Sequence, residues 1–228
     1  LTTQPTCSTA YTPTSSATTT PATSCTGATA TNYDISYVPG VITITKIPVV
    51  VKVPDITVPY DGGNHPTSCT VTAADNAVLT GTLTYSPALS SNAGTYVATC
   101  TFGGDDNHEP GTSTGTVKIN RVPLVITSSS HTVTYGSPVP TITPSFSGFV
   151  NGETSTVLGG TLSYGGAAQG AVNAGSYAIT PAGLTSSNYS ISFASGSLTV
   201  NPAVLTVTAS NASKTYDGTA LTKNSFTH

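Results

Sequence analysis

Short stretches in which apolar residues alternate with threonine or other small polar residues occur along the whole chain. Examples are residues 41–45 (VITIT), 69–72 (CTVT), 81–85 (GTLTY) and 115–119 (GTVKI). Because successive side chains of a strand point to opposite faces, a period of two predicts strands with one buried face. Residues 47–121 alone hold six or seven such short strands at close, regular spacing, and no helical period is present. This spacing predicts a β-sandwich.

The strand pattern is repeated in tandem. Tyr60, Tyr135 and Tyr216 each follow a strand and precede a turn that contains glycine, and they recur at nearly equal intervals along the chain. A second marker, Asn92–Tyr96 (NAGTY), recurs as Asn173–Tyr177 (NAGSY), displaced by the same interval that separates Tyr135 from Tyr216. A period of this length, with several markers in step, indicates an array of small domains rather than one domain. We take Tyr96 and Tyr177, like the other three tyrosines, as structural markers of the repeat.

The period divides the chain into four parts. Residues 47–121 and 122–202 are complete repeats, residues 1–46 correspond to the C-terminal part of a repeat, and residues 203–228 to its N-terminal part. Two explanations stay open. The chain is a window on a longer polypeptide, or its segment 203–228 complements a fragment like 1–46 of the next copy, as in strand-complemented fibres.

The amino-acid composition argues against two classes of function, nucleic-acid binding and membrane spanning. Charged residues make up 7% of the chain and the formal net charge is −3, so we expect no nucleic-acid partner. No apolar run reaches the roughly 18 residues that a spanning helix needs, so we expect no membrane span. The abundant threonine, serine, glycine and proline suit strands and turns.

The four cysteines are best explained as two disulfides. Cys25 and Cys100 are equivalent positions, separated by the same interval as the first two marker tyrosines, whereas residues 122–202 contain no cysteine. Cys69 and Cys100 are both missing from that repeat, which predicts that they bond to each other and that Cys7 bonds to Cys25. None has the short paired spacing of a zinc site. Disulfides predict an oxidising compartment, so we expect a secreted or cell-surface protein.

Several motifs, in order, resemble a known family. Those of the repeat 122–202 resemble the MBG domain of the YGX type: Tyr135–Ser137, Asn173–Tyr177, Asn188–Ile191 and Gly196–Pro202. Tyr216–Thr219 resembles the start of the related YDG domain, and the repeat 47–121 resembles a bacterial Ig-like version that usually carries a tyrosine where this chain has His108. The resemblance implies Ig-like modules arrayed in large bacterial surface or secreted proteins, commonly called adhesins, and implies no catalytic residue. The expected fold class is therefore all-β, a tandem array of small Ig-like β-sandwich domains forming an elongated rod.

The sequence contains few candidates for catalytic, metal-binding or ligand-binding residues. The four histidines, His65, His108, His131 and His228, accompany no nucleophile motif, so we expect neither an enzyme nor a cofactor. The loop that holds Asp105, Asp106 and Glu109 is a weak Ca²⁺ candidate, and the alternative is a solvated acidic turn. We expect Tyr60, Tyr135 and Tyr216 to pack at the same corner of each unit, with the hydroxyl bonded to backbone, rather than to bind a ligand.

These observations predict a structural extracellular repeat protein, a stalk or filament segment of a large bacterial surface adhesin or fibre. Its expected partners are copies of itself or neighbouring repeats of the same chain, joined end to end. The alternative is a ligand- or carbohydrate-binding adhesin module that contacts surface glycans through loops at one end of a sandwich.

Overall fold

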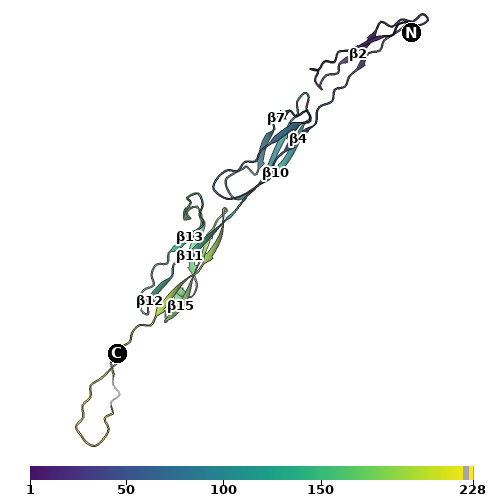
Figure 1. Cartoon of the computed structure of the whole chain (residues 1–228). Helices are drawn as coiled ribbons and strands as arrows, with labels where there is room; N and C mark the ends of the chain where they lie inside the picture. Colours follow the sequence, from purple (N-terminus) through teal and green to yellow (C-terminus); the bar gives the residue numbers. More distant parts are fainter. Residues whose placement is uncertain (223–225, 228) are drawn as a thin grey trace. The chain divides into compact units, whose positions relative to one another are not determined.

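The computed structural model describes residues 1–222 and 226–227, and it divides into two compact units, Leu1–Arg121 and Val122–His228. In this part of the chain every regular element is a strand, apart from two short 3₁₀ helices (Figure 1). The all-β fold predicted from the alternation is confirmed. None of the described residues lies in a helix with the length and apolarity needed to cross a membrane. The predicted partial repeat 203–228 includes residues 223–225 and 228, which lie outside the described residues.

In the first unit, residues 47–121 form two sheets. One has the order β4-β6-β7, made of Val49–Lys52, Thr70–Ala73 and Val78–Leu79. The other has the order β5-β10-β9-β8, made of Ile56–Pro59, Gly111–Asn120, Gly94–Phe102 and Thr82–Ser86. β4 contacts β9 and β10, strands of the other sheet. The two sheets therefore face each other as a sandwich.

The chain changes sheet between β4 and β5. Pro54 lies at this point and has no N–H to continue the β4 ladder. The carboxylate of Asp55 then accepts the backbone N–H of Thr116 at 2.7 Å, and β5 pairs in parallel with β10, with Ile56 opposite Val117. The opening segment of the repeat thus belongs to both sheets and ties them together.

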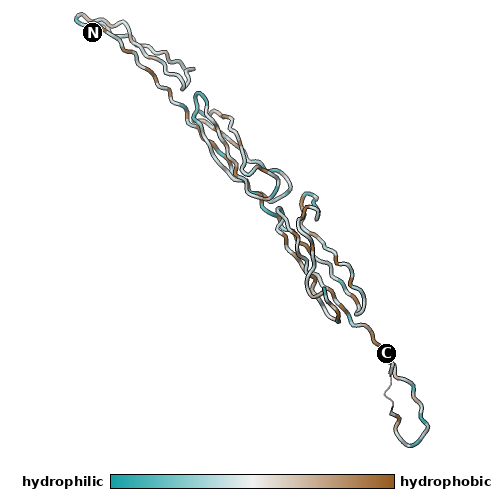
Figure 2. The backbone as a smooth tube through the Cα atoms, turned by 180° about the vertical axis from the view of Figure 1, so that it is seen from behind, coloured by the Kyte–Doolittle hydropathy of each residue, from teal (hydrophilic) through white to brown (hydrophobic). Residues whose placement is uncertain are grey.

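The alternation of the sequence sets the core of this repeat. On β9 the side chains of Tyr96, Ala98 and Cys100 are buried, and on β10 those of Val117 and Ile119 are buried. The positions between them are exposed or half-buried. Hydrophobic residues accordingly appear in short stretches along the strands in Figure 2 rather than as long apolar blocks.

Residues 1–46 form a single sheet with the order β1-β2-β3, made of Thr6–Thr9, Ala22–Thr26 and Gly40–Val41. β1 and β2 pair antiparallel with Cys7 opposite Cys25, so the threonine-rich stretch between them is the loop of a hairpin. The residues of β1 are all exposed, and those of β2 alternate between exposed and half-buried.

The second unit repeats the plan of the sandwich. Its small sheet has the order β13-β11-β16, made of Pro144–Ser147, Val122–Ser128 and Tyr189–Ala194. Its larger sheet has the order β12-β17-β15-β14, made of His131–Thr134, Gly196–Asn201, Gly175–Thr185 and Gly159–Gly165. As in the first unit, the opening segment changes sheet, and β12 pairs in parallel with β17.

The core of the second unit is closed by a short helix. Ile179, Leu198 and Val200 are buried on β15 and β17, and Ala168 of the 3₁₀ helix Ala167–Gly170 packs against them. The other 3₁₀ helix, Ser155–Val157, has no buried residue. Beyond β17, a short antiparallel pair joins β18 (Thr208–Ala209) to β19 (Phe226–Thr227).

Candidate functional site

Two disulfides use all four cysteines, with the predicted pairing of Cys7 to Cys25 and Cys69 to Cys100. The second bond joins the residue that precedes β6, in one sheet, to β9, in the other, and Cys100 is fully buried. The first bond joins neighbouring strands of one sheet. Cys69–Cys100 therefore links the two sheets across the core, whereas Cys7–Cys25 fixes the register of a hairpin.

The repeated NAG[T/S]Y motif forms a corner in both repeats. The hydroxyl of Tyr96 donates to the carbonyl of Asn92, and that of Tyr177 donates to the carbonyl of Asn173, each at 2.8 Å. A tyrosine bonded to the backbone a few residues upstream is the tyrosine corner of Ig-like sandwiches. These two markers are therefore structural, because each hydroxyl holds the turn that precedes a long strand.

Tyr60 and Tyr135 each make an equivalent main-chain hydrogen bond, but their rings differ in exposure. Their N–H groups donate to the carbonyls of Asn120 and Asn201 at 2.8 Å, which extends the parallel pairs β5–β10 and β12–β17. Tyr60 is 5% exposed, whereas Tyr135 is 54% and Tyr216 is 95% exposed. The expectation that all three rings pack at one shared corner is therefore wrong for Tyr135 and Tyr216.

The loop after Tyr60 shows how this position differs from the others. The carboxylate of Asp61 accepts the N–H of Gly63 at 2.7 Å and lies 2.9 Å from the ring of His65. The bond from Gly63 is the largest cause that lowers the pKa of Asp61, and His65 adds to it. Tyr135 is followed only by a tight turn in which the N–H of Ser137 donates to Thr134. The repeat thus preserves the main-chain bond, while the exposure of the ring and the bonds of the loop that follows differ between the two positions.

Tyr189 is an aromatic anchor at the start of β16. It is 1% exposed, and its ring meets that of Phe149 edge-on, with centroids 5.4 Å apart. Its hydroxyl donates to the carboxylate of Glu153 and accepts the N–H of Val150 at 3.2 Å. Burial raises the pKa of Tyr189, and the bond to Glu153 acts in the same direction.

His108 occupies the position in the first repeat that Tyr189 occupies in the second, since the two are separated by the same interval as Tyr96 and Tyr177. Its Nδ1 lies 2.8 Å from a carboxylate oxygen of Asp105, within hydrogen-bond distance. Its Nε2 has no hydrogen-bond partner among the described residues and lies 3.7 Å from a carboxylate oxygen of Asp75. Its side chain is 13% exposed. Where the second repeat has a tyrosine packed on an aromatic ring, the first therefore has a histidine between two carboxylates.

The acidic loop is a hydrogen-bonded turn. The carboxylate of Asp105 accepts the N–H groups of Asn107 and His108 at 2.8 and 2.7 Å, in addition to its contact with the His108 ring. The hydrogen bond from the ring of His108 is the main cause that lowers the pKa of Asp105. Across the described residues, no three side chains of the metal-binding types form a group that would hold an ion. Asp105, Asp106 and Glu109 are therefore not brought together as a Ca²⁺ site.

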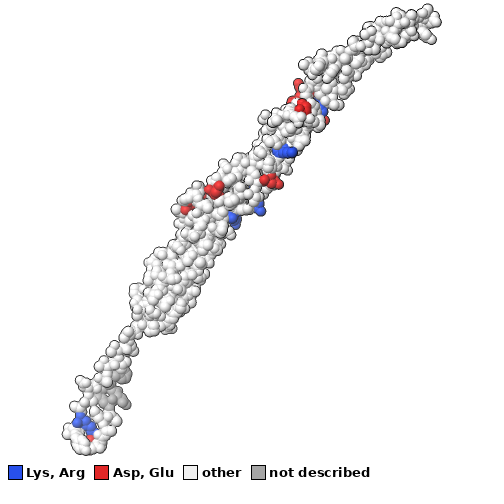
Figure 3. Space-filling model, viewed as in Figure 1, with Lys and Arg blue, Asp and Glu red and all other residues white. Residues whose placement is uncertain are grey.

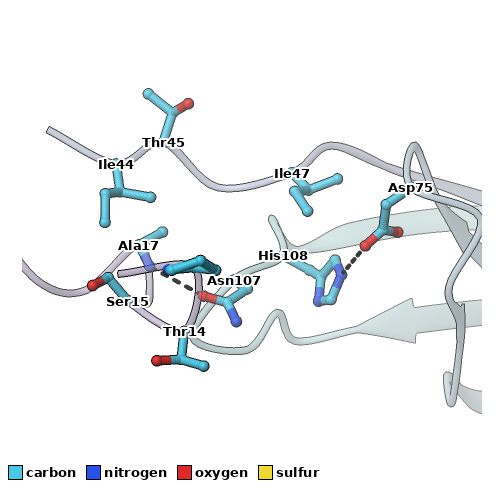
Figure 4. Close-up of a pocket in the computed structure, with 10 residues that line it drawn as sticks. Thr14, Ser15, Ala17, Ile44, Thr45, Ile47, Asp75, Asn107 and His108 are labelled. Carbon is cyan, nitrogen blue, oxygen red and sulfur yellow. Dashed lines mark hydrogen bonds and ion pairs between the residues drawn. The ribbon is translucent and has the colours of Figure 1, made fainter. Parts of the chain in front are cut away.

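A cleft of about 330 Å³ lies beside this loop, between the hairpin loop of residues 13–17 and the start of the complete repeat (Figure 4). The side-chain oxygen of Asn107 points to Ala17 and accepts its N–H at 3.1 Å. Ile44 and Ile47 lie along the opposite wall. The loop that carries His108 thus also bonds to the hairpin loop of residues 13–17.

Among the described residues, His65 and His131 lack the arrangement of a catalytic triad. Nε2 of His131 lies 2.8 Å from the hydroxyl of Ser129, which also accepts the N–H of Thr143. The contacts found for this pair among the described residues include no carboxylate, which a Ser–His–acid triad needs. His65 lies in the turn after Tyr60, and His228 lies outside the described residues.

Sequence reasoning missed Glu153 and Asp75. Glu153 contacts Tyr189 from a distant loop of the same repeat, and Asp75 approaches His108 from another loop. Neither acid belongs to a repeated motif, so the repeat gave no signal for them. Only the folded chain brings them to their partners.

Taken together, the two-sheet repeats, the tyrosine corners and the inter-sheet disulfide define a class of tandem all-β domains. Residues 50–123 match the MBG domain, and residues 124–199 match the MBG domain of the YGX type. The chain therefore carries two adjacent MBG domains. No match was found among curated proteins. MBG domains suggest a repeat domain of surface proteins, and the two disulfides fit an extracellular protein.

Proposed function

We propose that the chain is a structural segment of an extracellular repeat protein, part of the stalk or filament of a large bacterial surface adhesin or fibre. The observation that carries this proposal is the direct succession of two MBG domains. The last strand of the first, β10, ends at Asn120, and the first strand of the second, β11, begins at Val122. A single intervening residue, Arg121, leaves little slack between the modules, and Pro123 restricts the backbone further.

The surface of the second repeat suits a spacer. Between Val122 and Asn201 the only charged residue of the sequence is Glu153, and its carboxylate accepts the hydroxyl of Tyr189. The charged side chains visible in Figure 3 gather mainly over the first unit, and long stretches of the surface carry none. A surface without charge clusters offers few strong contacts to other macromolecules.

We propose further that this segment has no catalytic activity and binds no cofactor. Its partners are copies of itself or neighbouring repeats of the same chain, joined end to end by strand complementation between partial repeats. The protein is then secreted or held at the cell surface, where its disulfides persist.

Small-angle X-ray scattering of the monomeric 228-residue chain tests the spacer function. The control is a variant with about ten Gly/Ser residues inserted after Arg121, since such linkers behave as flexible coils. We expect the unmodified chain to give a narrower distribution of maximum dimensions than the insertion variant. Equally broad distributions would show that the modules already move independently, and the stalk proposal would fail.

A second candidate is a ligand- or carbohydrate-binding adhesin module. It is favoured by Tyr135, which lines a cleft of about 360 Å³ together with the exposed Val139 and Val172. A concave apolar surface with an aromatic ring is typical of small-molecule sites. Glycan-array binding that Tyr135→Ala abolishes and Tyr33→Ala preserves would favour this module, because Tyr33 is exposed elsewhere in the chain. Absence of binding would favour the spacer.

A further inference from the structure

β4 is an edge strand in the first repeat, although the equivalent strand of the second repeat is not. By the interval between Tyr60 and Tyr135, β4 corresponds to residues 124–127 of β11. β11 has a neighbour on each side, antiparallel to β13 and parallel to β16, whereas β4 in the described chain pairs with β6 alone. The equivalent of β16 is residues 108–113, and from Gly111 onward this segment pairs with β9 of the other sheet instead. One side of β4 is therefore open.

The open side of β4 presents the backbone groups of Val49 and Val51. In the antiparallel pair with β6, the N–H of Ala74 donates to the carbonyl of Pro48 at 3.1 Å. Because bonded pairs alternate along an antiparallel ladder, Pro48 and every second residue after it face β6, and Val49 and Val51 face away from it. Among the described residues, no main-chain hydrogen bond reaches Val49 or Val51 from that side. Their N–H and C=O groups are thus available to a strand of another chain.

The available edge is short. Just before β4, the N–H of Ile47 donates to the carbonyl of Asn107 at 2.7 Å, and the carbonyl of Ile47 accepts the N–H of Glu109 at 2.9 Å. This loop therefore closes the edge at Ile47. After β4, Pro54 marks the point where the chain changes sheet. A partner strand can pair only along the intervening residues 48–53, whose sequence is PVVVKV.

The side chains along this edge are mostly apolar. Val49 and Val51 are half-buried, and Val50 is 56% exposed on the outer face. A hollow of about 330 Å³ lies on the same face, and Val50, Pro48 and Thr72 are among the residues that line it. Apolar surface next to an unpaired strand edge is typical of a site for strand addition.

Three other edge strands carry features that oppose pairing with another chain. β5 ends with Pro59 and β13 begins with Pro144, and a proline cannot donate to a partner strand. The pairing of β14 with β15 is irregular between Gly160 and Ser163, which bends an edge away from a straight partner. In β4 the one such feature is Lys52, whose apolar stem can lie along a neighbouring valine while the ammonium stays in water. β4 is therefore less protected than these three strands.

We propose that two copies of the chain pair side by side through this edge, with β4 antiparallel to β4 of the second copy around a twofold axis at Val51. The two Val51 residues then exchange both main-chain hydrogen bonds. Val49 lies opposite Val53 of the second copy, and Val50 lies opposite its Lys52.

The occupant is a second copy because this strand is complementary to itself. In the register around Val51 no charge lies directly opposite a like charge, and the row of valines continues across the axis. The second repeat supports the geometry, since β16 occupies the equivalent edge of β11 along six residue pairs. This contact is lateral, so it goes beyond the end-to-end partners of the proposed stalk and uses a different surface.

Val51→Pro in the full chain tests the main-chain contact. Proline removes the N–H that donates across the axis, but no bond within the repeat, because that N–H faces away from β6. The matched control is Thr57→Pro, on the side of β5 where Pro59 already stands. Sedimentation equilibrium should show an average mass above the 22.8 kDa monomer for the unmodified chain and for the control. The association constant should fall about tenfold or more for Val51→Pro, and equal association would overturn the proposal.

Lys52→Glu tests the register. In the proposed pair the two Lys52 positions are diagonal neighbours on the outer face, about 7–8 Å apart. An equimolar mixture of the unmodified chain and Lys52→Glu should therefore associate more tightly than either chain alone, and this difference should shrink as salt is added. A mixture that is intermediate between the two separate chains would overturn the pairing around Val51.

Amide hydrogen exchange, read residue by residue by NMR, locates the contact. Exchange at Val49 and Val51 should slow as the concentration of the unmodified chain rises, while exchange at Thr57 stays constant. Two outcomes overturn the proposal: a chain that stays monomeric at about 1 mM, where even weak complexes form, and a mass that rises while exchange at Val51 does not change, as contacts at the chain ends would give. Either result leaves the spacer function standing, whereas a flexible joint at Arg121 in the scattering experiment refutes the spacer without affecting this edge.

Discussion

Reduction of the disulfides should destabilise the first MBG repeat and leave the second unchanged. Cys69 and Cys100 are 31 residues apart in sequence, and closing a loop of that length removes about 3.7 kcal/mol of chain entropy from the unfolded state. Residues 122–202 contain no cysteine. The second repeat is therefore an internal control within the same molecule.

The expected shift is large enough to separate the two transitions. In a domain of this size, 1 kcal/mol shifts the midpoint of thermal unfolding by about 4–8 °C. Loss of the Cys69–Cys100 bond should therefore lower the midpoint of the first repeat by about 15–30 °C. Thermal unfolding with and without a reductant measures the shift, and hydrogen exchange read by mass spectrometry assigns it, because β9 and β15 report on separate repeats.

A variant separates the contributions of the two bonds. Cys7→Ala with Cys25→Ala removes the bond within the β1–β2 hairpin and keeps Cys69–Cys100, so the first complete repeat should keep its midpoint. If reduction shifted both repeats equally, or shifted neither, the assignment of the Cys69–Cys100 bond as the staple between sheets would be refuted.

Three smaller changes test other contacts. Gly81→Ala places a Cβ 2.6 and 2.7 Å from the two sulfurs of the inter-sheet disulfide and should destabilise the first repeat by about 1–3 kcal/mol. Gly103→Ala, whose Cβ meets nothing within 4 Å, is the control, and equal urea midpoints would contradict the crowding. Tyr177→Phe should lower the free energy of unfolding of the second repeat, measured in urea, by about 1 kcal/mol. An unchanged free energy of unfolding would refute a stabilising role for the tyrosine corner. Because His108 lowers the pKa of Asp105 below 3.8, its carboxylate stabilises the fold above that pH, and the contribution is lost as the pH falls through the lower folded pKa. In the Asp105→Asn variant, the urea midpoint of the first repeat should therefore decrease less steeply as the pH is lowered. An unchanged dependence of the midpoint on pH would refute the contact between Asp105 and His108.

The all-β fold and the disulfide pairing could be predicted because they depend on local or repeated signals. Alternation along β9 and β10 is enough to identify strands with one buried face. The cysteines were paired by comparing repeats, since Cys69 and Cys100 are absent together from residues 122–202. Both arguments need only the spacing of residues along the chain.

The burial of the marker tyrosines and the partners of His108 could not be predicted in this way. Tyr60 and Tyr135 hold equivalent positions in the sequence repeat, but Tyr60 is buried and Tyr135 is exposed in the folded chain. Asp75 reaches His108 and Glu153 reaches Tyr189 through the fold, from loops that share no motif. A long-range contact to an unrepeated residue leaves no mark on periodicity.

The parallel pairing of β5 with β10, and of β12 with β17, has a mechanical consequence. In each repeat the paired strands lie near its beginning and its end, and four residues of each strand are in register. Tension applied along the polypeptide pulls these two strands in opposite directions along their common axis. The hydrogen bonds between them are then loaded together in shear instead of being opened one after another from an end. A repeat built this way yields to force only when the whole ladder ruptures at once.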